Sequence, residues 1–205
     1  SCQYNVFENN VSTNNSGQGF YLRTSSNNTI TGNTISNNNN WGVLFRSSSN
    51  NIVVGNTINN NNGFGFYIFA NSNNNLITNN VSSNNYGSDG YGFYIQGSLN
   101  NYFAQNTTYL NAMYALRLSD DCASDTFIKN NFYGSSLNPD SIVLNEDNQF
   151  FDFTNNYFGA TDSNVISRKF SGTYANKIQW YPYSYNIIDT AIGADTIAPD
   201  PVSII

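Results

Sequence analysis

Residues 28–35 (NTITGNTI) return as residues 51–58 (NIVVGNTI) and again as residues 74–81 (NNLITNNV), a step of about 23 residues. Looser copies lie at residues 4–11, 101–108, 125–132 and 150–157. Each copy is accompanied by a second motif, at residues 19–22 (GFYL), 42–45 (GVLF), 65–68 (GFYI), 92–95 (GFYI), 115–118 (ALRL) and 141–144 (SIVL). A fixed period of this length indicates a stack of equivalent structural units.

Apolar residues alternate within each motif, which is the period of two expected of a β-strand. Asn and Gly separate the motifs and tolerate the left-handed backbone of tight turns. A leucine-rich repeat has a similar period, but its Leu consensus and helical segment are missing here. The sequence therefore predicts an all-β fold, a right-handed, single-stranded parallel β-helix of about seven coils with a C-terminal cap.

Stacked coils lie ~4.8 Å apart, so equivalent residues form ladders along the axis. One asparagine ladder is predicted at Asn33, Asn56, Asn79, Asn106, Asn130 and Asn155. The predicted inward pairs are Phe20 and Leu22, Val43 and Phe45, Phe66 and Ile68, Phe93 and Ile95, Leu116 and Leu118, and Ile142 and Leu144. Residues 1–159 are predicted to form the coils, residues 160–190 the cap, and residues 191–205 a linker toward a further module of a larger chain.

The composition excludes several classes of function. The 205 residues include no His, which excludes Ser-His and Cys-His catalysis and His-ligated metals. Seven Lys and Arg with a net charge of −6 do not suit a nucleic-acid binder. No apolar run is long enough to span a bilayer, so we expect no membrane insertion. Several Asn-x-Ser/Thr sites favour a secreted or cell-surface protein.

The two cysteines, Cys2 and Cys122, fall at equivalent ladder positions, with Ser26, Ser49, Ser72 and Leu99 between them. Five coil steps separate them by about 24 Å. A disulfide needs Cα atoms within about 7 Å, so the sequence predicts that the chain cannot form an internal bridge.

A strip of aromatic and cationic side chains is predicted on the outside of the GFYL-type strands. The outward residues are Tyr21, Leu44, Tyr67, Tyr94, Arg117 and Val143, followed one position past the inward pair by Arg23, Arg46, Phe69, Gln96, Ser119 and Asn145. Exposed aromatic rings stack on the apolar faces of sugars, which makes Tyr21, Tyr67, Phe69, Tyr94, Arg23, Arg46 and Arg117 candidate substrate-binding residues. The alternative is an aromatic ladder that only stabilises the sheet.

Four carboxylates are expected near the end of this strip, with Asp120 beside Glu146 and Asp121 beside Asp147. Paired acids supply the acid and base of glycoside hydrolysis. The same oxygens suit Ca²⁺, and a solvated acidic loop is the third interpretation. A lyase or epimerase needs a base beside a neutralised uronate, for which Arg117 next to Tyr94 is the candidate.

The repeats resemble the parallel β-helix repeats of the carbohydrate-binding and sugar-hydrolase superfamily. The endings at residues 155–159 (NNYFG) and 180–183 (WYPY) are similar to closures of archaeal methanogen surface proteins, including the disaggregatase-related group. The resemblance implies a cell-surface or secreted module that binds polysaccharide and hydrolyses envelope or matrix glycan. A non-enzymatic structural or self-assembling module and a polysaccharide lyase or epimerase stay as alternatives, because relatives on these coils include all of them.

Overall fold

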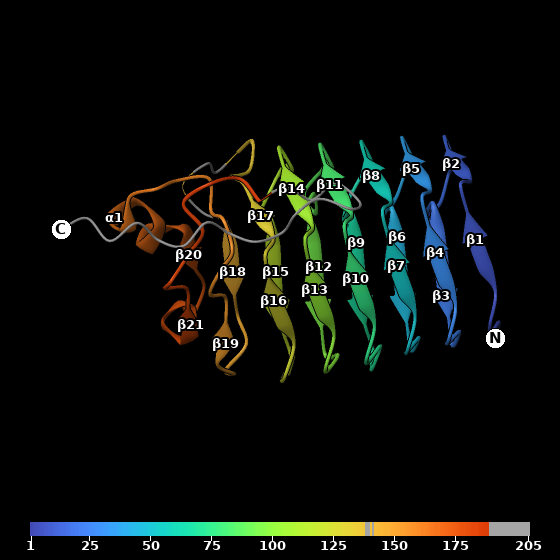
Figure 1. The fold of residues 1–205 in the computed structure, drawn as a ribbon. Coiled ribbons are helices and arrows are strands. Elements are labelled where there is room, and N and C mark those ends of the chain that lie inside the picture. The colour runs from blue at the N-terminus through green and yellow to red at the C-terminus, as the bar shows by residue number, and fades with distance from the viewer. Residues whose placement is uncertain (138–139, 141, 189–205) are drawn as a thin grey trace.

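The strands wind into a right-handed parallel β-helix (Figure 1), as predicted. The computed structural model describes residues 1–137, 140 and 142–188. Sheet A contains β1 (Val6–Glu8), β4 (Thr29–Thr31), β7 (Ile52–Val54), β10 (Leu76–Thr78), β13 (Tyr102–Ala104) and β16 (Thr126–Ile128). Sheet B contains β2 (Val11–Thr13), β5 (Thr34–Ser36), β8 (Thr57–Asn59), β11 (Val81–Ser83), β14 (Thr107–Tyr109) and β17 (Asn131–Phe132).

Sheet C carries the GFYL-type motifs. It contains β3 (Phe20–Arg23), β6 (Val43–Arg46), β9 (Phe66–Phe69), β12 (Phe93–Gln96), β15 (Leu116–Ser119), β18 (Val143–Asn145) and β20 (Phe170–Ser171). Strands of neighbouring coils pair in parallel, so each side chain lies over its equivalent in the next coil. The core is the stack of inward residues, among them the fully buried Phe45, Phe66 and Phe93.

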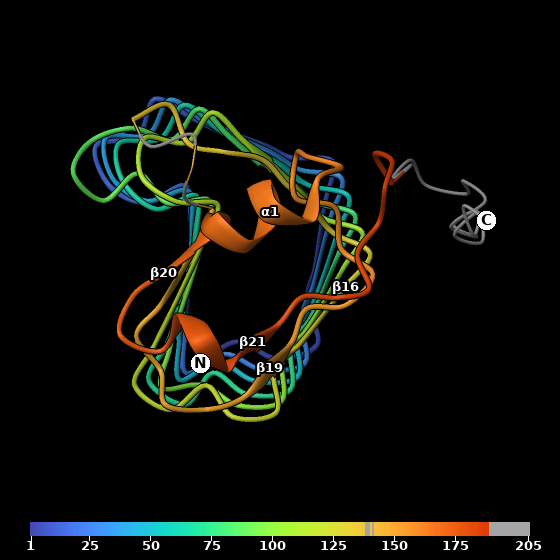
Figure 2. The same ribbon diagram turned by 90° about the vertical axis from the view of Figure 1, so that its left-hand side faces the viewer.

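Short elements close the C-terminal end of the core. Figure 2 shows α1 (Ser163–Ile166) lying across the end of the coils, where its Ile166 is buried in the core. The 3₁₀ turns η1 (Ser167–Lys169) and η2 (Ala175–Lys177) follow, and β21 (Ile178–Gln179) pairs with β19 (Phe151–Asp152). Because β20 extends sheet C, this segment both continues the coils and covers them. The predicted linker, residues 191–205, lies outside the described residues.

Three asparagine ladders fix the turns between the sheets. In each, the backbone N–H and side-chain amide of one Asn donate to Oδ1 of the Asn one coil later, as Asn56 does to Asn80 at 2.9 Å in both bonds. The ladders are Asn5, Asn28, Asn51, Asn75, Asn101 and then Asp125; Asn10, Asn33, Asn56, Asn80, Asn106, Asn130 and Asn156; and Asn15, Asn38, Asn61, Asn85 and Asn111. The buried amides are thereby satisfied along the whole stack.

The asparagine prediction was wrong at two positions, because Asn80 and Asn156 occupy the ladder in place of Asn79 and Asn155. Arg46 pairs with Phe69 23 positions later, whereas Ser48 bonds Ser72 at a separation of 24. One extra residue is therefore accommodated between these points, where Ala70 and Asn71 both have a left-handed backbone. This extra residue moves the ladder position of that coil from Asn79 to Asn80.

The last inward pair was also misplaced. Leu116 pairs with Val143 and Leu118 with Asn145, so Val143 and Asn145 take the positions predicted for Ile142 and Leu144. Leu144 points outward, opposite Arg117. Ile142 is nevertheless buried in the core. The longer loop before β18 offsets this coil by one residue.

The two cysteines do belong to one ladder, but the predicted members Ser26, Ser49 and Leu99 were wrong. The ladder runs through Ser25, Ser48, Ser72 and Ser98, so it is offset by one residue from the prediction in three of the four intermediate coils. Both cysteines are free thiols; Cys2 is exposed and Cys122 is buried. Among the described residues, no helix has the length and apolar character needed to cross a membrane.

Candidate functional site on the outer face of sheet C

The outer face of sheet C presents the predicted strip, with one correction. Register places Tyr21, Leu44, Tyr67, Tyr94 and Arg117 in one outward column, and the sixth member is Leu144 where Val143 was expected. The second column contains Arg23, Arg46, Phe69, Gln96 and Ser119 as predicted. Its last member is Glu146, next to Ser119, because Asn145 points inward. Neighbouring members of a column are one strand spacing apart.

Loops cover the middle of the strip, so the prediction that all its tyrosines are exposed was wrong. Tyr21 is 44% exposed, whereas Tyr67 and Tyr94 are only 8% and 6% exposed. Figure 2 shows the loops between sheets B and C bulging outward beside sheet C. These loops contribute Phe64 and Tyr91, which pack on Tyr67, Tyr94 and Leu44 in a second apolar cluster outside the coil.

Ring contacts hold this outer cluster together. Tyr67 stacks on Tyr94 with a centroid separation of 4.8 Å and on Phe69 at 4.6 Å. Phe64 from the loop lies 4.8 Å from Tyr67 and 5.1 Å from Tyr94. Such pairs stabilise by about 1 kcal/mol each beyond their buried area. The two inner tyrosines therefore form a rigid base for the exposed residues at the edge of the strip.

A hydrogen-bonded network runs along the second column. The Tyr67 hydroxyl donates to Oε1 of Gln96, and Nε2 of Gln96 donates to Oδ2 of Asp120 at 2.5 Å. The Tyr94 hydroxyl and the Ser119 hydroxyl are 2.9 Å apart. Burial raises the pKa of both tyrosines, so their phenols stay protonated and act as hydrogen-bond donors rather than bases.

Arg117 joins the aromatic cluster to the acidic end of the strip. Its guanidinium carbon lies 4.7 Å from the Tyr94 ring centroid and 5.5 Å from that of Tyr91. Its Nη2 and Nε donate to Oε2 of Glu146 at 2.7 and 2.9 Å. Glu146 is thus held by an arginine through two charge-assisted hydrogen bonds.

Arg23 and Arg46 lie at the other end and are both exposed. They are direct neighbours in the register of β3 and β6. Arg46 lies over the Phe69 ring at 5.7 Å from its centroid. Within the described residues neither arginine forms an ion pair, since Arg117–Glu146 is the salt bridge found there. This pair of charges is therefore available to an anionic ligand.

The four predicted carboxylates do not converge. Asn145 pairs with Leu118, so Glu146 lies beside Ser119 and not beside Asp120 as expected. The expected pair Asp121 with Asp147 is displaced by the same one-residue offset of β18. Asp147 is buried, and its oxygens accept from the Cys122 and Gln149 backbone N–H groups at 2.5 and 3.0 Å. Asp121 is exposed and accepts from Gln149 Nε2 at 3.4 Å.

These contacts do not fit a calcium site made by the four carboxylates. Glu146 is taken by Arg117, and Asp147 by backbone amides. Of the residues that the structure describes, no three His, Cys, Asp or Glu side chains group in a way that suits a metal ion.

The sequence analysis missed the loop aromatics Trp41, Phe64 and Tyr91 and the buried Asp125. The loop aromatics did carry a repeat signal, since each stands directly before the glycine of a GFYL-type motif, at Gly42, Gly65 and Gly92. The sequence also contained a signal for Asp125, since this residue stands where the five preceding coils have Asn. Burial raises its pKa to about 8.

Comparisons place the fold in a known family. The chain belongs to the right-handed beta helix region family, whose model matches residues 1–132. It is similar in structure to the pectate lyase Pel9A, with a TM-score of 0.60 and 15% identity over 88% of this chain and 48% of that one. It is also similar to the periplasmic alginate epimerase AlgG, with a TM-score of 0.52 and 19% identity over 75% of this chain and 34% of that one.

At these identities the two structures establish a shared fold. The chain spans about a third to a half of the length of each. A comparison with curated protein sequences gives no match.

Proposed function

We propose that this chain is a β-helix module that binds an acidic polysaccharide along the outer face of sheet C. The observation that carries the proposal is the exposed pair Arg23 and Arg46, adjacent in register and without an ion pair among the described residues. Two cations one strand spacing apart form a local anion site in which each guanidinium can bind a carboxylate of a uronate chain.

The distribution of charge supports an anionic ligand. The protein has a net charge of −6 and seven Lys and Arg. Three of these seven, Arg23, Arg46 and Arg117, lie on this one strip. A local concentration of cations on an otherwise acidic molecule attracts anions at short range while the net charge discourages non-specific association.

Aromatic residues beside the arginines supply the apolar contact that sugars need. Tyr21 is exposed in the first column, and Phe69 is half-buried beneath Arg46. Tyr67 and Tyr94 support Phe69 from the covered part of the strip through stacking. A sugar ring resting on Tyr21 or Phe69 keeps its acidic groups within reach of Arg23 and Arg46.

The comparisons are consistent with this class of ligand, because the two similar structures are an alginate epimerase and a pectate lyase, and alginate and pectate are both polyuronates. The resemblance of residues 155–159 and 180–183 to closures of archaeal surface proteins supports a secreted or cell-surface setting.

Affinity electrophoresis in gels containing polygalacturonate or alginate tests the binding. We expect the double variant Arg23→Ala/Arg46→Ala to lose at least tenfold in affinity, and added salt to weaken wild-type binding. Arg168→Ala removes an exposed arginine away from the strip and serves as the control for charge. Equal retardation of both variants would contradict the proposal and favour the non-enzymatic structural module.

Catalysis on the bound glycan is the second candidate, and the Gln96–Asp120 contact beside Arg117 favours it. In an elimination, Arg117 would exchange Glu146 for the uronate carboxylate, Asp120 would take the proton from the adjacent carbon, and the glycosidic C–O bond would break as the C=C bond forms, with water protonating the leaving oxygen. In an epimerisation, that carbon would instead regain a proton from water on its opposite face. In a hydrolysis, Asp120 or Asp121 would supply the acid or base, because Glu146 and Asp147 are engaged.

Product analysis separates these reactions. Ultraviolet absorbance detects the unsaturated sugar of an elimination, NMR detects epimerisation, and a reducing-end assay detects hydrolysis. Loss of any of these activities in Asp120→Asn, with binding retained, would support the corresponding reaction. Activity unchanged in both Asp120→Asn and Asp121→Asn would remove these residues from the mechanism.

A further inference from the structure

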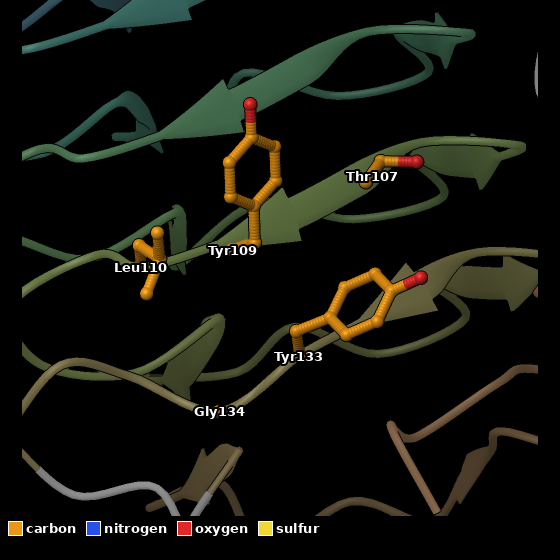
Figure 3. Close-up of a pocket in the computed structure, with 5 residues that line it drawn as sticks. All are labelled: Thr107, Tyr109, Leu110, Tyr133 and Gly134. Carbon is orange, nitrogen blue, oxygen red and sulfur yellow. The ribbon is translucent and has the colours of Figure 1, made fainter.

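A hollow lies on the outer face of sheet B, away from the strip on sheet C. Its volume is about 450 Å³, and it is lined by Thr107, Tyr109, Leu110, Tyr133 and Gly134. Figure 3 shows both tyrosine rings broadside to the viewer, with Leu110 beside Tyr109 and Thr107 farther along β14. The volume is within the range of small-molecule sites, about 300 to 1,000 Å³.

The tyrosines break the pattern of the column in which they stand. The preceding coils place Thr13, Ser36, Asn59 and Ser83 at this position, and Tyr109 comes next. Tyr133 follows Tyr109 one coil later, since its N–H donates to the Thr108 carbonyl. A face built from small polar residues thus changes to aromatic residues in two successive coils. Tyr133 also packs edge-on against Tyr157, with ring centroids 5.6 Å apart, whereas no ring contact holds Tyr109 among the described residues.

Leu110 is a stronger departure, because its backbone disfavours it. Its φ is +53°, and the equivalent residues of earlier coils are all asparagines with φ between +53° and +57°: Asn14, Asn37, Asn60 and Asn84. Asn tolerates this conformation, whereas a residue such as Leu is strained in it by about 1 kcal/mol. Leu110 is also 54% exposed, so core packing does not compensate for the strain.

The lining chemistry identifies the class of ligand. It combines two aromatic faces with an aliphatic side chain and contains no charged residue. Among the described residues, neither the Tyr109 nor the Tyr133 hydroxyl has a hydrogen-bond partner, so both can bond to sugar hydroxyls. Aromatic faces with hydroxyls at their edges match a pyranose ring, whose C–H face is apolar and whose rim is polar.

We propose that this hollow is a second glycan-binding site, specific for uncharged sugar units and separate from the acidic-glycan strip. A chain with both uncharged and uronate units, or two different glycans, would then contact two faces of the same rod. The site does not depend on the arginines of sheet C, so each proposal is tested without the other.

The test uses native affinity electrophoresis in galactomannan, xylan and hydroxyethylcellulose. We expect at least one of these neutral polymers to retard the wild type, and Tyr109→Ala and Tyr133→Ala each to weaken that retardation about tenfold. Tyr102→Ala is the matched control: Tyr102 lies in the same coil on sheet A and is 40% exposed, against 37% for Tyr109. Arg23→Ala/Arg46→Ala should leave binding to the neutral polymer unchanged.

Leu110→Asn distinguishes loss of a ligand contact from loss of folding. This substitution restores the residue of the earlier coils, so the melting temperature should stay equal or rise while binding to the neutral polymer weakens. The proposal is overturned if no neutral polymer binds, or if Tyr102→Ala weakens binding as much as Tyr109→Ala. It is also overturned if Tyr109→Ala changes only the sedimentation of the protein with concentration, which would make the hollow a contact between copies of the chain.

Discussion

Asp125 shows how one residue departs from its ladder and sets a pH response. Its Oδ1 accepts from the Asn101 backbone N–H at 2.6 Å, while its buried Oδ2 has no partner among the described residues. Burial raises its pKa from 3.8 to about 8, the Asn101 hydrogen bonds oppose the shift, and nearby Asp147 adds to it. The folded chain therefore holds a proton here that the unfolded chain releases above pH 4.

The sign of the effect follows from the raised pKa. The contribution of Asp125 to the free energy of unfolding is fully present below about pH 4. It is lost as pH rises toward 8, with a slope of about 1.4 kcal/mol per pH unit. We expect Asp125→Asn to remove this slope and to raise stability at pH 7 by about 2 to 4 kcal/mol, because its amide can donate to the Ser98 carbonyl as earlier ladder members do to theirs. Urea unfolding from pH 4 to 9 measures the slope and the stability at pH 7, and a variant of an exposed carboxylate, Asp152→Asn, is the control. An unchanged slope in Asp125→Asn would show that Asp125 is ionised in the fold.

Cys122 stands where earlier coils have a serine and keeps the hydrogen bonds that this serine makes, unlike Asp125 in its asparagine ladder. Its Sγ donates to the Ile95 and Ser119 carbonyls at 3.3 and 3.1 Å, as Ser48 Oγ does to Leu22 and Arg46. Burial raises the pKa of the thiol, which makes it a poor nucleophile. We predict that a thiol reagent labels Cys2 alone in the native protein and both cysteines in urea, and that Cys122→Ser changes stability by less than about 1 kcal/mol. Rapid native labelling of Cys122 would contradict its burial.

At the scale of the element, the repeat defines the strands but not their register beyond an insertion. The period of 23 holds up to Arg46 and Phe69, and the sheets, the inward pairs and the outward column follow from it. The extra residue at Ala70 and Asn71 is invisible in the sequence, because Asn79 and Asn80 are the same amino acid and either one fits the pattern. Only the hydrogen bonds distinguish them.

Because the sequence does not distinguish Asn79 from Asn80, one variant at each position tests which of the two belongs to the ladder. Asn80 bonds Asn56, Asn106 and the Val53 carbonyl within the buried ladder, whereas Asn79 occupies a left-handed turn position beside it. We expect Asn80→Ala to cost on the order of 3 kcal/mol, because it leaves buried donors and acceptors unpaired. Asn79→Gly keeps the turn and should cost about 0.5 kcal/mol or less. Chemical denaturation of the two variants provides the comparison, and equal costs would contradict the assigned register.

The candidate site was predictable only where it follows from register. Alternation places Arg23, Arg46 and Arg117 on the outside of sheet C, and the structure has them there. The burial of Tyr67 and Tyr94 does not follow from strand alternation, because it depends on Phe64 and Tyr91, loop residues that precede the strands at equivalent positions of successive coils. Ladder arithmetic locates side chains on a face but contains no information about what the intervening loops cover.

For the whole molecule, the ends of the rod differ in how they are closed. Each internal coil pairs with neighbours on both sides, and α1 covers the C-terminal end of the core. In the polypeptide of residues 1–205, the strands β1, β2 and β3 pair on one side only, and Phe7 and Phe20 are only partly buried. In a solenoid, stability is approximately a sum over coils and their interfaces, so a coil with one interface opens at the lowest free energy.

We therefore predict a gradient of amide hydrogen exchange along the rod. Peptides from residues 1–23 should exchange fastest, peptides from the coils of β7 to β15 slowest, and peptides around α1 at an intermediate rate. Mass spectrometry of deuterium uptake measures this order, and Phe20→Ala is the matched perturbation. Loss of the Phe7–Phe20 contact, with centroids 5.8 Å apart, should speed exchange in the first two coils and leave β12 and β15 unchanged. A uniform acceleration in all coils would show instead that the rod unfolds as a single cooperative unit, in which no coil opens before the others.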